Sequence, residues 1–266
     1  MSGNLSATAD PLFDLHDRVV VLTGGCGLIG RALASACVSR GARVALVDIA
    51  ATKPGEAAAT LGSAAAGFVA DVSDAAQVRQ LSEAIRKQFD RVDVLVNNHQ
   101  FKPAGFTEAT AERFPDELWD AIVRVNLTGT FYTCREFGRI MLEQGKGSII
   151  NVASTYGVVS SNPDLYTGNS LGNPVAYSAS KGGVIMLTKY LGAYWAERGV
   201  RVNCVTPHGV LNNHESGFIE RFRAKSPMRR LMTADEVVGA VVFLASDASS
   251  YATGSNVLIE GGWTAW

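Results

Sequence analysis

Residues 19–30 read VVVLTGGCGLIG, an unbroken apolar run followed by a cluster of glycines. An unbroken run of this length is typical of a strand buried on both faces, as in a parallel sheet. An apolar-periodic stretch continues from Leu28 to Ser39, and Gly41 follows at a position suited to a helix C-cap. The segment therefore predicts a strand, a tight turn and a helix, the first unit of an alternating α/β fold.

The same alternation continues along the chain and predicts a Rossmann-type, doubly wound parallel sheet of about seven strands with helices on both faces. Further strands are expected at Arg43–Val47, Gly67–Ala70, Val92–Val96, Ser148–Ala153, Val200–Val205 and Asn256–Ile259. Helices are expected at Ala75–Phe89, Glu117–Gln144, Val175–Arg198 and Ala234–Ser246. Because no repeat or low-complexity linker divides the chain, we predict one domain over residues 18–266 after a flexible leader at residues 1–17.

Composition excludes several classes of protein. Of the 266 residues, 47% are hydrophobic and 18% are charged, which rules out a disordered or fibrous chain. Because 24 basic residues balance 25 acidic ones, nucleic acid is not an expected partner. The longest apolar runs, such as Val237–Ala245, are much shorter than the roughly 20 residues that span a bilayer, so no membrane partner is expected.

The cysteines point to a compartment rather than to a site. Cys26, Cys37, Cys134 and Cys204 are scattered, and no two have the spacing of a redox pair or a zinc site. We therefore expect no metal centre. Scattered cysteines without a secretion signal favour the reducing cytoplasm.

The glycine cluster and Asp48 suggest a nucleotide site. Glycines between a strand and a helix permit a tight turn and a close approach of the backbone to a pyrophosphate, although such a turn also occurs without a ligand. Asp48 ends the second strand, near the offset of about 20 residues at which an acid accepts hydrogen bonds from ribose hydroxyls. A carboxylate repels a 2′-phosphate, so the expected cofactor is NAD rather than NADP. The alternative is an Asp48 that is merely solvated at the strand end.

A second group of residues suggests acid–base chemistry. Tyr177 and Lys181 are four residues apart, so they share one face of a predicted helix. A lysine cation beside a phenol lowers its pKa and lets it exchange a proton near neutral pH. Taken alone, such a pair is common on exposed helices. Here, however, Ser154 follows a strand at the ligand-binding edge of the sheet, and Asn126 lies on the preceding helix.

Together these residues resemble the short-chain dehydrogenase/reductase family, in its short single-domain branch, from Asp17 to Gly262. The resemblance implies that Tyr177 is the general acid/base and that Lys181 lowers its pKa and binds the nicotinamide ribose. Ser154 would hold the substrate oxygen, and Asn126 would hold a water that links Lys181 to solvent.

The resemblance also implies a cofactor site made of the glycine loop and the strand ends. In that site Asp71 and Val72 would flank the adenine, Asn98 would line the cleft, and Val210 would approach the carboxamide. The expected cofactor residues are Gly24, Cys26, Gly27, Leu28, Ile29, Gly30, Asp48, Asp71, Val72, Asn98, Tyr177, Lys181, Pro207 and Val210.

The sequence departs from the family at the substrate end. His99 and His208 stand near the expected nicotinamide end, where they serve either substrate recognition or simply tolerance of a polar side chain. The loop over residues 155–176 is longer than usual and polar, and it contains Tyr156 and Tyr166. It is expected to overhang the substrate, or else to make subunit contacts only. We therefore expect His99, Tyr156, Tyr166 and His208 to contact a small polar substrate.

Two further segments are expected to cover the site or its surroundings. Residues 211–230 lie where the family has its mobile lid, and the basic side chains there either attract an anion or solvate a helix. The C-terminal Trp263 and Trp266 predict a tail buried between subunits or over a neighbouring active site. The family is usually dimeric or tetrameric, so a homo-oligomer is expected. The loop and the tail also look like those of family members in bacterial surface-sugar and nonulosonic-acid pathways.

These residues favour an NAD-dependent enzyme that interconverts a secondary alcohol and a ketone on a sugar-like or hydroxy-acid substrate. The spacing of the glycine loop, T-G-x-x-G-x-x-G, leaves an alternative open, because it is more usual in sugar-nucleotide epimerases and dehydratases that recycle NAD internally. The length of the chain opposes that alternative, since no room is left for the substrate domain of that branch. A non-catalytic dinucleotide-binding protein is a third reading, which the full set of Asn126, Ser154, Tyr177 and Lys181 opposes.

Overall fold

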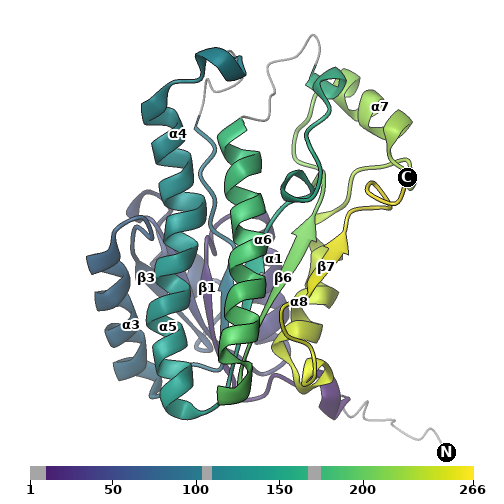
Figure 1. Ribbon diagram of the computed structural model, residues 1–266. Helices are drawn as coiled ribbons and strands as arrows, with labels where there is room; N and C mark the ends of the chain where they lie inside the picture. The colour runs from purple at the N-terminus through teal and green to yellow at the C-terminus, as the bar shows by residue number, and fades with distance from the viewer. Residues whose placement is uncertain (1–9, 104–109, 167–174) are drawn as a thin grey trace, which may run out of the picture.

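A computed structural model describes residues 10–103, 110–166 and 175–266 of the chain. They form a seven-stranded sheet in the order β3-β2-β1-β4-β5-β6-β7, with every neighbouring pair parallel (Figure 1). The strands are β1 (Val19–Thr23), β2 (Arg43–Asp48), β3 (Ala65–Val69), β4 (Val94–Asn97), β5 (Gly147–Val152), β6 (Val200–Pro207) and β7 (Asn256–Ile259). The predicted Rossmann-type sheet is therefore confirmed.

The helices follow the predicted alternation, with two additions. They are α1 (Leu28–Val38), α2 (Pro54–Ala59), α3 (Ala75–Phe89), α4 (Asp116–Val123), α5 (Thr130–Gln144), α6 (Val175–Trp195), α7 (Ser216–Lys225) and α8 (Val238–Ala245). Neither α2 nor α7 was predicted. The first is too short and alanine-rich to show an apolar periodicity, and the second lies in the expected lid. A π-helical segment, Arg124–Gly129, joins α4 to α5.

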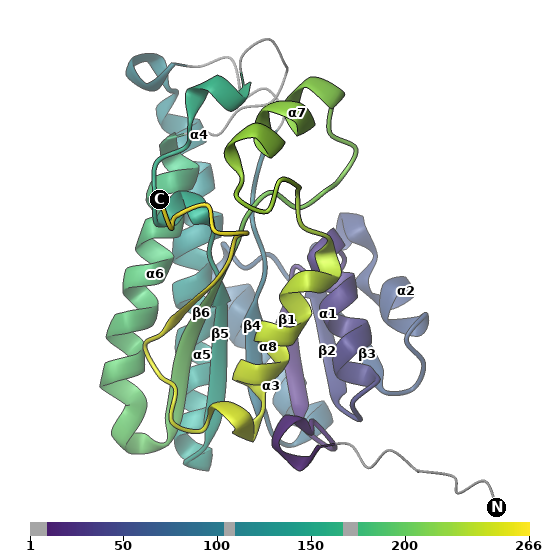
Figure 2. The same cartoon turned by 90° about the vertical axis from the view of Figure 1, so that its right-hand side faces the viewer.

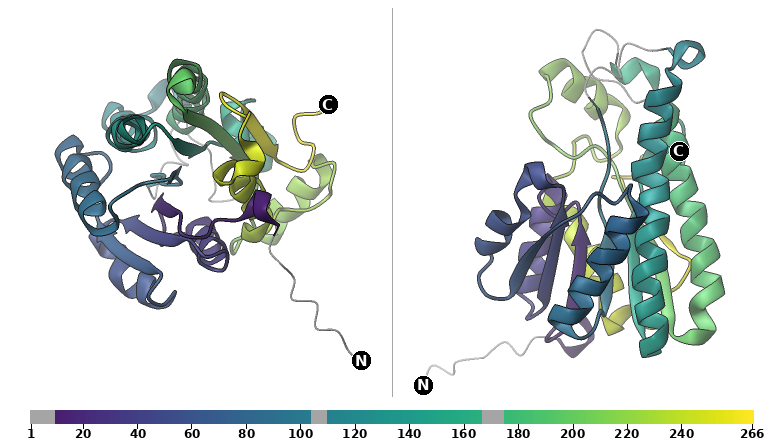
Figure 3. Two further views of the ribbon diagram at one scale, coloured as in Figure 1. Left: turned by 90° about the horizontal axis from the view of Figure 1, so that it is seen from below. Right: turned by 90° about the vertical axis from the view of Figure 1, so that its left-hand side faces the viewer.

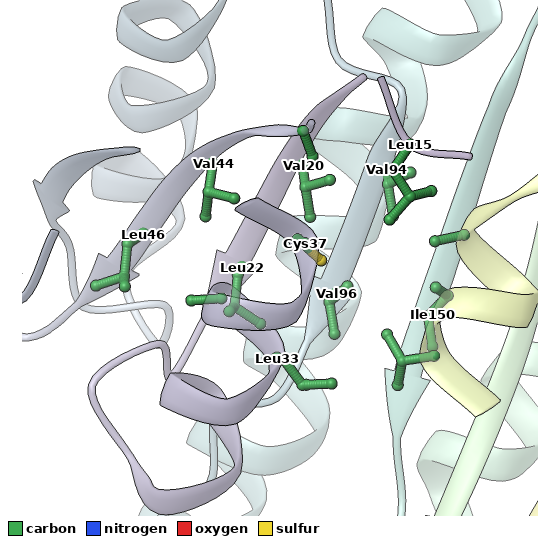
Figure 4. Close-up of a cluster of buried hydrophobic side chains, with 14 of the residues drawn as sticks. Leu15, Val20, Leu22, Leu33, Cys37, Val44, Leu46, Val94, Val96 and Ile150 are labelled. Atoms are coloured by element: carbon green, nitrogen blue, oxygen red, sulfur yellow. The ribbon is translucent and has the colours of Figure 1, made fainter. Parts of the chain in front are cut away.

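Alternate residues of each central strand pack on opposite faces of the sheet. On one face Val20 and Leu22 contact α1 and α8, and Figure 4 shows Leu33 and Cys37 of α1 over these strands. On the other face the side chains of β1 pack against α3, α5 and α6. Figures 2 and 3 show the resulting three layers of helix, sheet and helix.

The topology fixes where a ligand can bind. β1 pairs with β2 on one side and with β4 on the other, so the chain winds away from β1 in two directions. The loops that leave the carboxyl ends of β1 and β4 diverge there, and such a switch point is where doubly wound sheets bind ligands. The lid helix α7 lies beyond this edge of the sheet (Figure 2).

The described part of the predicted leader is more ordered than expected. Leu15 is fully buried in the cluster that contains α1 and α8, and Asp17 donates its N–H to the carbonyl of Gly41. Residues 10–17 therefore belong to the domain, while residues 1–9 lie outside the described part. Among the described residues, no helix combines the length and the apolar character that crossing a membrane requires.

Candidate active site

A cleft of about 1240 Å³ opens at the carboxyl ends of the strands. All of the predicted cofactor residues except Gly30 line it, as do Ser154 and the four side chains expected to contact substrate. The cofactor residues concerned are Gly24, Cys26, Gly27, Leu28, Ile29, Asp48, Asp71, Val72, Asn98, Tyr177, Lys181, Pro207 and Val210. Gly30 and Asn126 do not line the cleft but lie behind it.

The glycine loop is held close to the sheet by its own backbone. Gly24 has a φ of +63°, and its carbonyl accepts a hydrogen bond of 2.9 Å from the side-chain amide of Asn98. A Cβ on Gly30 would lie 2.2 Å from that same carbonyl oxygen, so the absence of a side chain at Gly30 lets the helix approach the loop. Gly27 caps α1, whose unpaired N–H groups and dipole fit a pyrophosphate.

Asp48 ties the end of β2 to this loop. Its Oδ2 accepts a hydrogen bond of 3.0 Å from the N–H of Cys26, and its Oδ1 accepts one of 2.8 Å from the N–H of Ile49. Asp71 and Val72 follow β3 further along the same wall. This half of the cleft fits the adenosine of a dinucleotide, because a carboxylate, an apolar side chain and a cradle of N–H groups occur together there.

Tyr177 lies across the cleft, near the N-terminus of α6, and only 5% of its surface is exposed. Burial opposes ionisation of the phenol, but the cations of Lys102 and Lys181 and a hydrogen bond from Ser154 outweigh it, so the pKa of Tyr177 is lowered. Its hydroxyl also donates to the side-chain oxygen of Gln100 at 3.4 Å. The phenol is therefore prepared for proton transfer.

The lysine and the asparagine of the predicted catalytic set are buried beside it. Lys181 donates from Nζ to the carbonyl of Val152 at 2.7 Å, and burial lowers its pKa, although Tyr177 opposes that effect. Asn126 is fully buried in the π-helical segment, where its Oδ1 accepts from the N–H of Phe101 at 2.7 Å. Widened turns of this kind recur at functional sites because they redirect side chains.

His99 lines the cleft as expected, and its ring is also held by two hydroxyls of the protein. Its Nδ1 lies 2.7 Å from the hydroxyl of Thr23, and its Nε2 lies 3.2 Å from the hydroxyl of Thr130. Burial lowers the pKa of His99 to about 3, with Lys181 adding to the effect, so the ring is neutral. Because both nitrogens have partners within the protein, the ring of His99 joins β1 to α5 at the wall of the cleft.

The other three expected substrate residues meet in one wall. The hydroxyl of Tyr166 donates to that of Tyr156 at 2.7 Å, and the ring of His208 lies edge-on to Tyr156 at 5.3 Å between centroids. Burial raises the pKa of Tyr156 to about 12 and lowers that of His208 to about 4. The Nε2 of His208 is buried without a hydrogen-bond partner among the described residues.

The lid and the C-terminal tail complete this wall. The rings of Phe222 of α7 and Trp263 pack against His208 in tilted orientations, with centroid separations of 4.9 and 4.3 Å. Trp263 thus packs on the site of its own chain, whereas Trp266 is 78% exposed. The basic lid residues bind protein groups: Arg221 donates to the carbonyl of Leu165, and the others pair or bond elsewhere in the described chain. These further contacts are Lys225 with Asp164, Arg230 with Glu236, Arg223 with the carbonyl of Arg229, and Arg229 with the carbonyl of Ala224.

Sequence reasoning missed several residues that reach the cleft. Lys102 places its Nζ 4.5 Å from the centre of the Tyr177 ring, and His214, Phe218 and Phe222 come from the lid. The position of Lys102 was detectable, since it lies on the loop that follows β4 at the ligand-binding edge. The lid aromatics gave no comparable signal because α7 was not predicted. The rest of the 155–176 loop, residues 167–174, lies outside the described residues.

A glycine loop at the switch point, with a buried serine, tyrosine and lysine across the cleft, defines a dinucleotide-dependent oxidoreductase. Residues 27–264 match a family model described as enoyl-(acyl carrier protein) reductase. The chain belongs to the short-chain dehydrogenase/reductase family.

Individual relatives agree with this assignment. D-threitol dehydrogenase of Mycolicibacterium smegmatis is 40% identical over 95% of each chain. A short-chain dehydrogenase of Leptospira borgpetersenii with bound NAD+ superposes with a TM-score of 0.86, at 32% identity and 99% coverage of each chain. A gluconate 5-dehydrogenase of Burkholderia cenocepacia, in complex with NADP and tartrate, has a TM-score of 0.85, at 30% identity, and 96% of this chain and 98% of that one are covered.

These findings establish the reaction class. The chain is an enzyme that oxidises or reduces at a CH–OH group, and a nicotinamide dinucleotide is the supported cofactor. Because these similar structures contain NAD in one case and NADP in the other, the comparisons do not decide between the two cofactors.

Proposed function

We propose that the protein interconverts a secondary alcohol and a ketone on a small polyhydroxylated substrate, with NAD as cofactor. The observation that carries this proposal is the phenol of Tyr177, which is buried beside two lysine cations and receives a hydrogen bond from Ser154. A group of this kind exchanges a proton with an alcohol or a carbonyl oxygen.

In the proposed reaction the bound nicotinamide supplies or accepts the hydride. Tyr177 accepts the hydroxyl proton during oxidation and returns it during reduction. Ser154 holds the reacting oxygen next to the phenol and stabilises charge that develops there. Lys181 favours the ionised phenol, and Asn126, buried behind it, is proposed to hold a water for proton exchange with solvent.

The substrate class is proposed from the wall opposite the glycine loop. Tyr156, Tyr166 and His208 bring two hydroxyls and an unpartnered ring nitrogen to the cleft. Groups of this type suit hydroxyl-bearing ligands better than acyl chains. Relatives whose names specify threitol and gluconate support this choice, rather than the surface-sugar pathways suggested by the loop and tail.

An epimerase or dehydratase that recycles its cofactor is the second candidate function. It rests on the spacing of the glycine loop alone. Against it, the relative at 40% identity, with 95% of each chain covered, is a dehydrogenase. Stoichiometric formation of NADH during turnover distinguishes the two, because internal recycling yields no net NADH.

The choice of NAD rests on Asp48, and a binding titration tests it. We expect the wild-type protein to bind NADH in preference to NADPH when cofactor fluorescence is followed. Asp48→Ala should reverse the preference by lowering the affinity for NADH about tenfold and raising the affinity for NADPH about tenfold. Each change corresponds to about one hydrogen bond to a charged group. Asp48→Asn is the matched control, because it removes the charge but still accepts from the N–H of Cys26. A wild-type preference for NADPH would contradict the NAD assignment.

We further propose a homo-oligomer, dimeric or tetrameric, in the cytoplasm. The exposed face of α6 supports association, since Met186, Tyr190 and Tyr194 are each more than 60% exposed there and the two tyrosines stack on each other. Four separate buried thiols suit a reducing compartment.

A further inference from the structure

Lys102 places a second ammonium group beside the catalytic tyrosine. Its Nζ lies 4.5 Å from the centre of the Tyr177 ring, while the Nζ of Lys181 lies 5.9 Å from that centre. The two lysines come from different elements, the loop after β4 and helix α6. Lys102 also lines the open cleft, so it is accessible to a ligand that reaches Tyr177.

The charges that line the cleft are unevenly distributed. Its two carboxylates, Asp48 and Asp71, follow β2 and β3 at the adenosine end. Among the described residues, no carboxylate lines the part contributed by the β4 loop, residues 154–166, α6 and α7. The burial-lowered pKa values of His99 and His208 leave both rings neutral there at pH 7. Within the described residues, Lys102 and Lys181 of the substrate end thus have no carboxylate beside them in the cleft lining.

Several other basic residues near the site have partners, although Arg124 is a further cation of the cleft lining. Lys181 donates to the carbonyl of Val152, Lys225 pairs with Asp164, and Arg230 pairs with Glu236. Lys102 differs from them, because within the described chain its ammonium lies over the aromatic ring of Tyr177 and no carboxylate lies within ion-pair distance. Lys102 is exposed in the cleft, so an anionic ligand that enters the cleft can pair with its ammonium group.

We propose that Lys102 binds a carboxylate of the substrate, which makes the substrate a polyhydroxylated acid rather than a neutral polyol. This inference rests on the proposed function and specifies its substrate class. A single ammonium matches a monoanionic carboxylate, and its place beside Tyr177 puts that carboxylate close to the carbon that is oxidised. The hydroxyls of Tyr156 and Tyr166 and the free nitrogen of His208 then serve the hydroxyl groups of the same molecule.

Matched pairs of acid and alcohol test this inference. Threonate and threitol differ only by a carboxylate in place of a hydroxymethyl group, and gluconate and glucitol form a second pair. We expect the wild-type enzyme to oxidise at least one acid with a higher kcat/KM than its paired alcohol. Lys102→Met should lower kcat/KM for the acid about 10- to 100-fold, mainly through KM, because a charge-assisted hydrogen bond is lost. The same variant should also lower the value for the alcohol, because Tyr177 loses a neighbouring cation, but by a smaller factor, so that the ratio of acid to alcohol falls about tenfold.

Two variants serve as controls. Lys102→Arg should retain the preference for acids, since it keeps the cation. Lys225→Met removes a lysine whose partner is Asp164 on the loop and should not change the ratio of acid to alcohol. The inference is overturned if the wild type prefers the alcohol of each pair. It is also overturned if Lys102→Met lowers kcat/KM for the acid and for the alcohol by the same factor and shifts the alkaline limb of the pH profile. Lys102 would then act only through Tyr177.

The failure of the proposed function gives a different result. If neither acids nor alcohols are oxidised with NAD or NADP, although the cofactor binds, both the proposed function and the inference fall. If threitol or glucitol is oxidised and its acid is not, only the inference falls.

Discussion

The two ends of the cleft are built in different ways. The adenosine end is formed by consecutive strand–loop–helix units between β1 and Val72, and much of its shape comes from backbone atoms, such as the Gly24 carbonyl beside Gly30. The substrate end is formed by side chains from four distant segments: the loop after β4, the 155–166 loop, α7 and the C-terminal tail. Backbone geometry constrains the first end, whereas side-chain packing determines the second.

Because they are built differently, the two ends of the cleft contribute differently to catalysis. A site made of backbone and strand ends binds the part of a ligand that is constant, here the dinucleotide. A site made of side chains on loops and a lid changes with few substitutions, so it is where substrate specificity resides. The catalytic tyrosine lies between the two ends, on α6.

Tyr177→Phe should produce the largest effect and should separate the two ends. Loss of the proton-transferring hydroxyl is expected to lower kcat by about 1,000-fold or more, near the upper part of the range for general acid–base catalysis. Binding of NADH, followed by fluorescence, should change little. The control is Tyr190→Phe, on the exposed face of the same helix. Turnover within about tenfold of wild type would exclude Tyr177 as the acid/base.

Gly30→Ala should have the converse effect, at the adenosine end. The new Cβ would lie 2.2 Å from the carbonyl oxygen of Gly24 and 2.7 Å from that of Gly25, so the loop has to move. We expect the Kd for NADH to rise about 100-fold, a loss of roughly 3 kcal/mol of binding free energy. Gly239→Ala is the matched control, because Gly239 lies on α8 and its Cβ would meet nothing within 4 Å. Unchanged NADH binding in Gly30→Ala would contradict a backbone-determined site.

The same difference explains how far the sequence alone led. The glycine loop, Asp48, Ser154, Tyr177 and Lys181 lie at strand ends or at a fixed spacing on one helix, so local patterns predicted their positions. Gly30 was predicted at the cleft and lies behind it, because spacing does not reveal which side of a helix faces the loop. His99 lines the cleft as predicted, but its contacts with the hydroxyls of Thr23 and Thr130 were not predicted, because they join segments far apart in the sequence.

Local sequence patterns could not predict the arrangement of the substrate end, for a related reason. Tyr156, Tyr166 and His208 were each singled out, yet their meeting depends on α7 and Trp263, which pack on them from distant parts of the chain. Aromatic contacts of this kind depend on tertiary packing and leave no periodic signal. Lys102 was missed for the same reason, since its significance appears only once α6 brings Tyr177 beside it.

His208→Phe should give the smallest effect and should test the packing of this end. His208 is 6% exposed, and burial lowers its pKa to about 4, so the folded protein keeps it neutral while the unfolded chain protonates it near pH 6.5. The unfolded state therefore binds more protons between these values, and stability falls as pH decreases from 6.5 towards 4. Each pH unit in that window costs up to about 1.4 kcal/mol from this one group.

Phenylalanine keeps the aromatic contacts with Tyr156, Phe222 and Trp263 but does not titrate. Urea unfolding at pH 7 and pH 5 should therefore show a smaller loss of stability in His208→Phe than in the wild type, by about 2 kcal/mol over that interval. His99, whose pKa is lowered to about 3, contributes a similar loss in both proteins and cancels in the comparison. An equal loss in both proteins would mean that the ring of His208 reaches water, and the wall that it forms with Trp263 would then be open rather than packed.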